Sequence, residues 1–252
     1  MKKEKLISLV VAILLAAGWY CYDYYTAKST SDKEELGSVN NVKTEQKVKE
    51  SITAEKQKLL SLKYTGDPYI QLNGNVSSFT DEELTTKNFI KLSELDELGR
   101  CGVAYACLSK EDMPSGKRGS IGMIKPSGWH TVRYDDVIKD RYIYNRCHLL
   151  AWSVSGLLAD ERNLITGTRY MNIEGMCDQE EIIRNYIKHT DNHVLYRVTP
   201  IFKDSELVAR GVHMEAKSVE DNGKGVEFNT YSFNVQPKIK IDYATGESRK
   251  EK

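Results

Sequence analysis

The chain has 252 residues, and its 36 Lys and Arg residues balance its 36 Asp and Glu residues. Zero formal charge excludes a general basic surplus as a basis for nucleic-acid binding, so any such partner would have to be recognised by a local site. A 40% hydrophobic content is enough for an ordinary core and excludes a wholly disordered chain. Five cysteines are too few for a disulfide-rich scaffold.

Residues 1–26 are predicted to form a signal anchor, or transmembrane segment. Three lysines precede an uncharged run, Leu6–Tyr22, which Asp23 ends. Basic residues in front of an apolar segment favour a cytoplasmic N-terminus. We therefore expect a cell-membrane protein whose remaining chain is extracellular. Cleavage after Gly18, which follows two alanines, would instead give a secreted protein.

The rest of the chain is predicted to hold a polar linker, one domain and a short tail. Residues 27–64 are rich in Lys, Glu, Ser, Thr and Asn, which predicts a solvated linker with a transient helix over 51–62. The domain is expected over 65–246, and a charged tail over 247–252.

Strand and helix patterns alternate within the predicted domain. Strands are expected over 102–108, 193–202, 207–219 and 226–243, because β-branched and aromatic residues are frequent there. Isoleucines at helical spacing predict a helix over 178–188. The expected fold class is α+β, an antiparallel sheet with helices inserted between its strands.

The chemistry is predicted to lie between residues 141 and 181. Four of the five histidines have ordinary surroundings, but His148 ends a strand-like run that begins at Arg141. Asn163 and Asn172 follow it, nine residues apart. A helix that opens with acidic residues comes next, with Glu180 and Glu181 in its first turns.

This order of residues resembles a known family, the DNA/RNA non-specific endonucleases of the ββα-metal superfamily, and in particular the membrane-anchored DNA-entry type. Its signature is Asp-Arg-Gly-His, an Asn about fifteen residues later, a second Asn and an acidic residue. In this chain the matching positions are Asn145-Arg146-Cys147-His148, Asn163, Asn172, and Glu180 or Glu181. The resemblance implies a ββα-metal nuclease fold and a Mg²⁺-dependent nuclease.

The residue types suit hydrolysis of a phosphodiester bond. A neutral imidazole can take a proton from water near neutral pH, so His148 is the expected general base. Mg²⁺ often takes only one or two protein oxygens, so the amide oxygen of Asn172 would suffice as a direct ligand, as the resemblance implies. Glu180 is expected to hold a metal-bound water in the second coordination shell, with Glu181 as the other candidate. Mn²⁺ could substitute for Mg²⁺, and no small-molecule cofactor is expected.

Two further residues have two readings each, and two arginines are considered beside them. Arg146 is a candidate for binding a phosphate, or it forms a structural salt bridge with Asp140 or Asp160. Asn163 positions His148 or the metal waters, or it only shapes a turn. Arg133 is a weak substrate-binding candidate, whereas Arg118 is left out because Lys117–Ser120 has the composition of a surface turn.

Asn145 and Cys147 depart from the family signature, and they leave alternatives open. Cys147 replaces a glycine, so the residue before the base cannot adopt a positive φ without strain. The expected function is a metal-dependent, sequence-non-specific endonuclease that cuts DNA, with RNA undecided, at the cell surface. DNA uptake, scavenging and biofilm degradation are not distinguished. The alternatives are a catalytically impaired DNA-binding protein of the same fold, a structural surface protein, and a thiol hydrolase that uses Cys147.

Overall fold

The computed structural model describes the backbone of residues 38–251 and the side chains from residue 50 onward. The predicted anchor, its apolar run Leu6–Tyr22 and the cleavage position at Gly18 lie outside the described residues. Within residues 38–251, no helix combines the length and the apolar character that crossing a membrane requires.

The described residues divide into two units, and the first contains residues 38–62 and 78–84. Its described part consists mainly of helix α2, Ser38–Ser61. The sequence predicted a polar linker with a helix only over 51–62, so the helix is longer than expected. Its 24 residues include no glycine or proline, and nothing in them interrupts helical hydrogen bonding.

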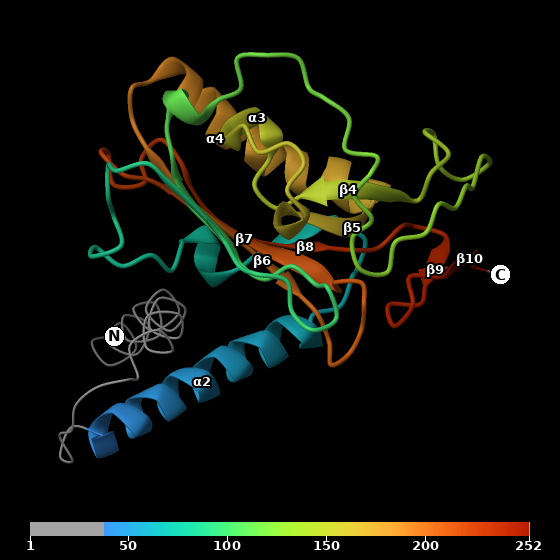
Figure 1. Ribbon diagram of the computed structural model, residues 1–252, viewed down its shortest axis with the longest axis horizontal. Helices are drawn as coiled ribbons and strands as arrows, with labels where there is room; N and C mark the ends of the chain where they lie inside the picture. Colours follow the sequence, from blue (N-terminus) through green and yellow to red (C-terminus); the bar gives the residue numbers. More distant parts are fainter. Residues whose placement is uncertain (1–37, 252) are drawn as a thin grey trace. The chain divides into compact units, whose positions relative to one another are not determined.

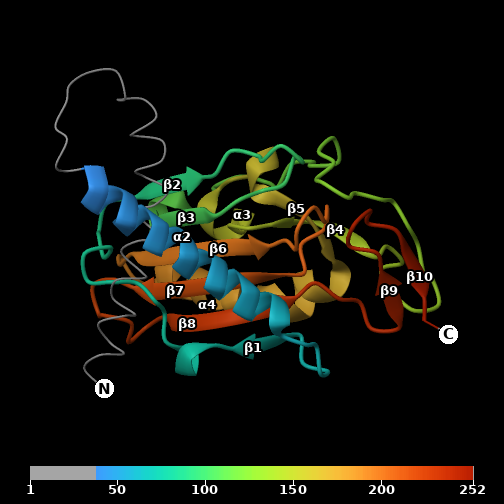
Figure 2. The same ribbon diagram turned by 90° about the horizontal axis from the view of Figure 1, so that it is seen from below.

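The second unit contains residues 63–77 and 85–252, and a six-stranded sheet forms its centre. All neighbouring strands are antiparallel, in the order β1-β8-β7-β6-β3-β2 (Figure 2). The strands are β1 Tyr69–Gln71, β2 Phe89–Leu92, β3 Ala104–Leu108, β6 Val194–Ile201, β7 Gly211–Ser218 and β8 Glu227–Phe233. The antiparallel sheet expected from the sequence is therefore confirmed.

The C-terminal residues differ from the sequence prediction. The run predicted over 226–243 ends as β8 at Phe233, and a separate strand β9, Ile239–Ile241, follows. Strand β10, Ser248–Lys250, pairs with β9 through a turn in which Gly246 has a φ of +86°. The residues predicted as a charged tail, 247–252, therefore include a short edge strand, because the turn folds the chain back onto β9.

A second layer lies on one face of the sheet (Figure 1). It contains the antiparallel pair of β4, Tyr144–His148, and β5, Leu164–Thr168. Helix α3, Trp152–Ser155, lies in their connection, and a π-helix over Met171–Met176 leads from β5 into α4, Cys177–His189. The helix predicted over 178–188 is therefore confirmed. Three short 3₁₀ turns complete the fold, at Asn73–Asn75, Lys110–Asp112 and Glu161–Asn163.

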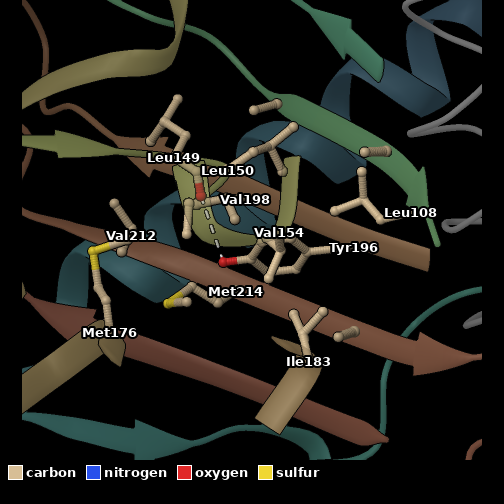
Figure 3. Close-up of a cluster of buried hydrophobic side chains, with 14 of the residues drawn as sticks. Leu108, Leu149, Leu150, Val154, Met176, Ile183, Tyr196, Val198, Val212 and Met214 are labelled. Carbon is tan, nitrogen blue, oxygen red and sulfur yellow. Dashed lines mark hydrogen bonds between the residues drawn. The ribbon is translucent and has the colours of Figure 1, made fainter. Parts of the chain in front are cut away.

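The hydrophobic core lies between the sheet and this second layer (Figure 3). Ile183 of α4 and Val154 of α3 are buried there, together with Tyr196 of β6 and Met214 of β7. The Tyr196 hydroxyl donates a hydrogen bond of 3.5 Å to the Leu149 carbonyl, one residue beyond β4. Burial of each large apolar side chain contributes about 1.5–3 kcal/mol to the free energy of unfolding. The end of β4 is therefore packed against a stable core.

Candidate active site

Cys147 and His148, the last two residues of β4, face the core and an open pocket, respectively. Cys147 is fully buried in the core, whereas His148 lines the pocket together with Arg146 and Tyr144. Adjacent residues of a strand point to opposite faces, so this arrangement follows from the strand itself. The pocket has a volume of about 750 Å³, and its polar and aromatic lining includes Arg118, Trp129, Asn145, Arg146, His148, Trp152, Arg169, Asn172 and Glu180.

The ring of His148 is held in one orientation and one tautomer. Nε2 lies 2.9 Å from the Leu158 carbonyl oxygen, which can only accept, so Nε2 carries the proton. Nδ1 is left with a lone pair, 3.4 Å from Nη2 of Arg118. Burial, and secondarily the positive charge of Arg118, lower the pKa of His148, although the hydrogen bond to Leu158 opposes them. The ring is therefore a neutral base at physiological pH.

Arg118 is a site residue that the sequence analysis left out. It lies 30 residues before His148, in a segment whose composition is that of a surface turn. The fold nevertheless brings its guanidinium to Nδ1 of His148, and its charge lowers the pKa values of both His148 and Glu180. No local sequence signal distinguishes it, because its role depends on a contact with a distant strand.

Asn172 and Glu180 line the same pocket as His148, as the sequence predicted. Asn172 lies in the π-helix, and Glu180 lies one turn into α4. Neither side chain has a hydrogen-bond or ion-pair partner among residues 50–251. Burial raises the pKa of Glu180 to about 8, although Arg118 partly offsets this. A partly buried carboxylate and an amide oxygen that line the same pocket provide oxygen donors that suit a hard divalent cation.

The arrangement does not form a closed, all-protein metal cage. No group of three or more His, Cys, Asp and Glu side chains suited to a metal is present among the described residues. Mg²⁺ keeps several waters and commonly takes one or two protein oxygens. The oxygen donors of Asn172 and Glu180 are compatible with a divalent cation held in this way.

Asn163 lies outside the pocket and is fully buried. Its Oδ1 accepts from the Leu150 backbone N–H at 2.9 Å, and its Nδ2 donates to the Leu150 carbonyl at 3.0 Å. Its own carbonyl also accepts from the N–H of Leu149. Asn163 thus fixes the backbone directly after His148, so any influence on catalysis acts through the position of the base.

Arg146 makes neither of the salt bridges considered from the sequence. Asp140 pairs with Arg169, and Asp160 pairs with Arg162. The Arg146 guanidinium instead stacks on Trp129, 4.0 Å from the ring centroid, and donates to the carbonyls of Ile124 and Gly122. Arg146 lines the pocket, but two of its guanidinium nitrogens already donate hydrogen bonds to the loop that follows Arg118.

Arg133 does not line the pocket. Its guanidinium forms a bidentate pair with Asp135, with distances of 3.1 and 3.0 Å, and it lies over the ring of Tyr142. Of the two arginines that precede the motif, Arg118 and not Arg133 lies in the pocket, next to His148.

The two departures from the family signature have different surroundings. Asn145 lines the pocket, and its amide has no hydrogen-bond partner among residues 50–251. Cys147 has a negative φ and is fully buried, so the easy positive φ of glycine is not needed there. Burial raises the pKa of the Cys147 thiol well above its usual value. A thiol that faces away from His148 and resists ionisation is a poor nucleophile, which argues against the thiol hydrolase reading.

The disulfide question left open by the sequence also has an answer. Cys101, Cys107, Cys147 and Cys177 are all free thiols, and the first three are buried. Burial raises the pKa values of Cys101 and Cys107 to about 12. These cysteines therefore act as small core residues.

A histidine, an asparagine and a glutamate that line one pocket on a β-β-α unit form the candidate site of a nuclease. The sequence profile of the family described as DNA/RNA non-specific endonuclease matches residues 80–220, more than half of the chain. The chain belongs to this family of nucleases.

Solved structures of nucleases share the fold. The crystal structure of NucA from Streptococcus agalactiae with magnesium ion bound has a TM-score of 0.65 and 27% sequence identity, covering 77% of this chain and 95% of that one. The structure of Sda1 nuclease with bound zinc ion has a TM-score of 0.60 and 23% identity, covering 73% and 97%. The mixed α and β fold is therefore that of the ββα-metal nucleases.

Proposed function

We propose that this protein is a Mg²⁺-dependent endonuclease that hydrolyses phosphodiester bonds of DNA without sequence preference, with His148 as the general base. The observation that carries the proposal is the fixed tautomer of His148 in the pocket that Asn172 and Glu180 also line, because it leaves Nδ1, 3.4 Å from Nη2 of Arg118, as the nitrogen that can accept a proton. RNA is a second candidate substrate, because the family description includes it.

His148 accepts a proton at Nδ1 from the attacking water, and its Nε2–H bond to Leu158 keeps the ring in position meanwhile. Arg118, next to Nδ1, is placed to donate to a phosphate oxygen as negative charge builds up there. Arg146 presents its remaining N–H groups to the same pocket, while its stack on Trp129 keeps the guanidinium in a fixed plane. Asn163 is a positioning residue that holds Leu150.

Asn172 would hold the metal directly through its amide oxygen, and Glu180 would bind one of the metal's waters. When bound, the cation would supply positive charge to the phosphate and to the departing oxygen. NucA, which is similar to this chain, has been crystallised with a magnesium ion, and this supports the choice of metal. Mn²⁺ has the same preference for oxygen ligands and is expected to substitute.

The predicted anchor over residues 1–26 would place this nuclease at the outer surface of the cell membrane. Cleavage after Gly18 would release it instead. The basic and apolar residues of the N-terminal sequence support the membrane location, for which DNA uptake is the role that the resemblance suggests.

The test incubates the full-length protein with supercoiled plasmid in Mg²⁺, with and without EDTA. We expect nicked and then linear DNA, no cleavage in EDTA, and a loss of about 10²–10⁴-fold in rate for His148→Ala. His189→Ala is the matched control, because His189 is exposed on the last turn of α4. Asn172→Ala should raise the Mg²⁺ concentration for half-maximal activity by about tenfold or more.

The second candidate is a catalytically impaired DNA-binding protein of the same fold, favoured by the replacement of the signature aspartate by Asn145. A plasmid that stays intact in Mg²⁺ while its gel mobility shifts would support that candidate. Absence of both cleavage and binding would contradict both functions.

A further inference from the structure

Arg169 lies at the end of β5 and lines the same pocket as His148. Its backbone is fixed, because its N–H donates to the Ile143 carbonyl at 2.7 Å. The N–H of the preceding residue, Thr168, also bonds to Oδ1 of Asn234 at 2.8 Å. The guanidinium therefore extends into the pocket from a rigid base.

The side chain of Arg169 forms an ion pair with Asp140, which also lines the pocket. The pair remains in contact with water, since the side chains of Arg169 and Asp140 are 33% and 51% exposed. An ion pair of this exposure contributes only about 0.2–1 kcal/mol. A ligand that offers a better anion can therefore separate it at little cost.

We propose that Arg169 binds a backbone phosphate of the nucleic acid next to the scissile one, and that Asp140 competes with this phosphate for the guanidinium. The proposal rests on the proposed function, since it assumes that the pocket receives a nucleic-acid strand. A guanidinium binds carboxylate and phosphate in the same bidentate geometry, so the two anions are direct competitors. Asp140 also repels the strand, which limits its affinity in a chain without a general positive charge.

The two members of the pair are therefore expected to have opposite effects on binding. A structural ion pair would respond in the same direction to loss of either partner, because each loss breaks the same contact. If Asp140 competes with the phosphate for Arg169, removal of Arg169 weakens DNA binding and removal of Asp140 strengthens it.

The test measures binding of a labelled DNA duplex to the full-length protein by fluorescence anisotropy in EDTA, where binding is separated from cleavage. Arg169→Gln should weaken binding by about three- to tenfold and reduce the slope of log K against log salt by about 0.9. Asp140→Asn should strengthen binding by about two- to fivefold. The part of that gain that acts through Arg169 should disappear in the double variant, which leaves only the relief of the repulsion by Asp140.

The matched control is the Arg162–Glu94 pair, which is another solvent-accessible ion pair and does not line the pocket. Arg162→Gln should leave both affinity and salt slope nearly unchanged. Weaker binding by Asp140→Asn, or equal losses from Arg162→Gln and Arg169→Gln, would overturn the inference. If the wild-type protein neither binds nor cleaves DNA, the proposed function itself fails, whereas normal wild-type binding with unchanged Arg169→Gln binding refutes only the role of Arg169.

Discussion

Gly167 of β5 lies against the thiol of Cys147, and a Cβ at position 167 would come within 2.2 Å of Sγ. Cys147 stands where the family signature has glycine. The missing side chain of Gly167 creates the space that the added thiol occupies, so the strand pair that carries His148 keeps its register, with His148 opposite Leu164.

This compensation predicts the outcome of a double-mutant cycle. Gly167→Ala should destabilise the protein by about 1–3 kcal/mol through overpacking, which lowers Tm by roughly 2–10 °C. Combining it with Cys147→Gly should recover a large part of the loss, because the thiol that clashes is then absent. Calorimetry would measure the four melting temperatures. Gly116→Ala is the control, since a Cβ there meets nothing within 4 Å, and additive losses from the two changes would contradict the compensation.

The pH dependence of cleavage should report the protonation of His148. Burial and Arg118 lower its pKa below the usual 6.5, and only the neutral ring can accept a proton. In saturating Mg²⁺, log kcat/KM should therefore rise with pH and level off at an inflection below 6.5. Arg118→Gln should reduce the rate and move this inflection upward, because a positive charge next to the ring is removed. Arg162→Gln should leave it in place, and an inflection above pH 7 in the wild type would be inconsistent with His148 as the base.

Glu180 should make the metal-free protein less stable at high pH. Its pKa is about 8 in the folded state, against a usual value of 4.5. The folded protein therefore retains a proton that the unfolded chain loses, and stability present below pH 4.5 is lost as the pH rises toward 8. Glu180→Gln removes this loss, so its Tm in EDTA should exceed that of the wild type by about 4 °C or more at pH 8.5, but not at pH 4.

Two comparisons make this measurement specific. Glu181→Gln is the matched control, because Glu181 is exposed, pairs with Arg184 and has a lowered pKa, so its replacement should not raise Tm. Mg²⁺ should stabilise the wild type more than Glu180→Gln, since a cation compensates the buried carboxylate. An equal Tm gain for Glu180→Gln at pH 4 and pH 8.5 would show that ionisation is not the cause.

The sequence by itself was sufficient to select residues that share one pocket and to locate several of the regular elements. The resemblance of His148, Asn172 and Glu180 to a nuclease signature identified three side chains that line one pocket, and the isoleucine period located α4. These features are local, because strand alternation and helical periodicity determine where such side chains point. Cys147 and His148 face opposite sides of β4 for the same reason.

The tertiary structure alone decided which residues surround the motif. Arg118 contacts His148 from a loop, and Arg146 stacks on Trp129. Asp140, which was considered as a partner of Arg146, forms its ion pair with Arg169 instead. A charged side chain in a loop can form ion pairs or hydrogen bonds with many different partners, and sequence spacing does not indicate which partner it contacts. The packing of distant segments makes that choice, and it determines which positive charges are available to a phosphate.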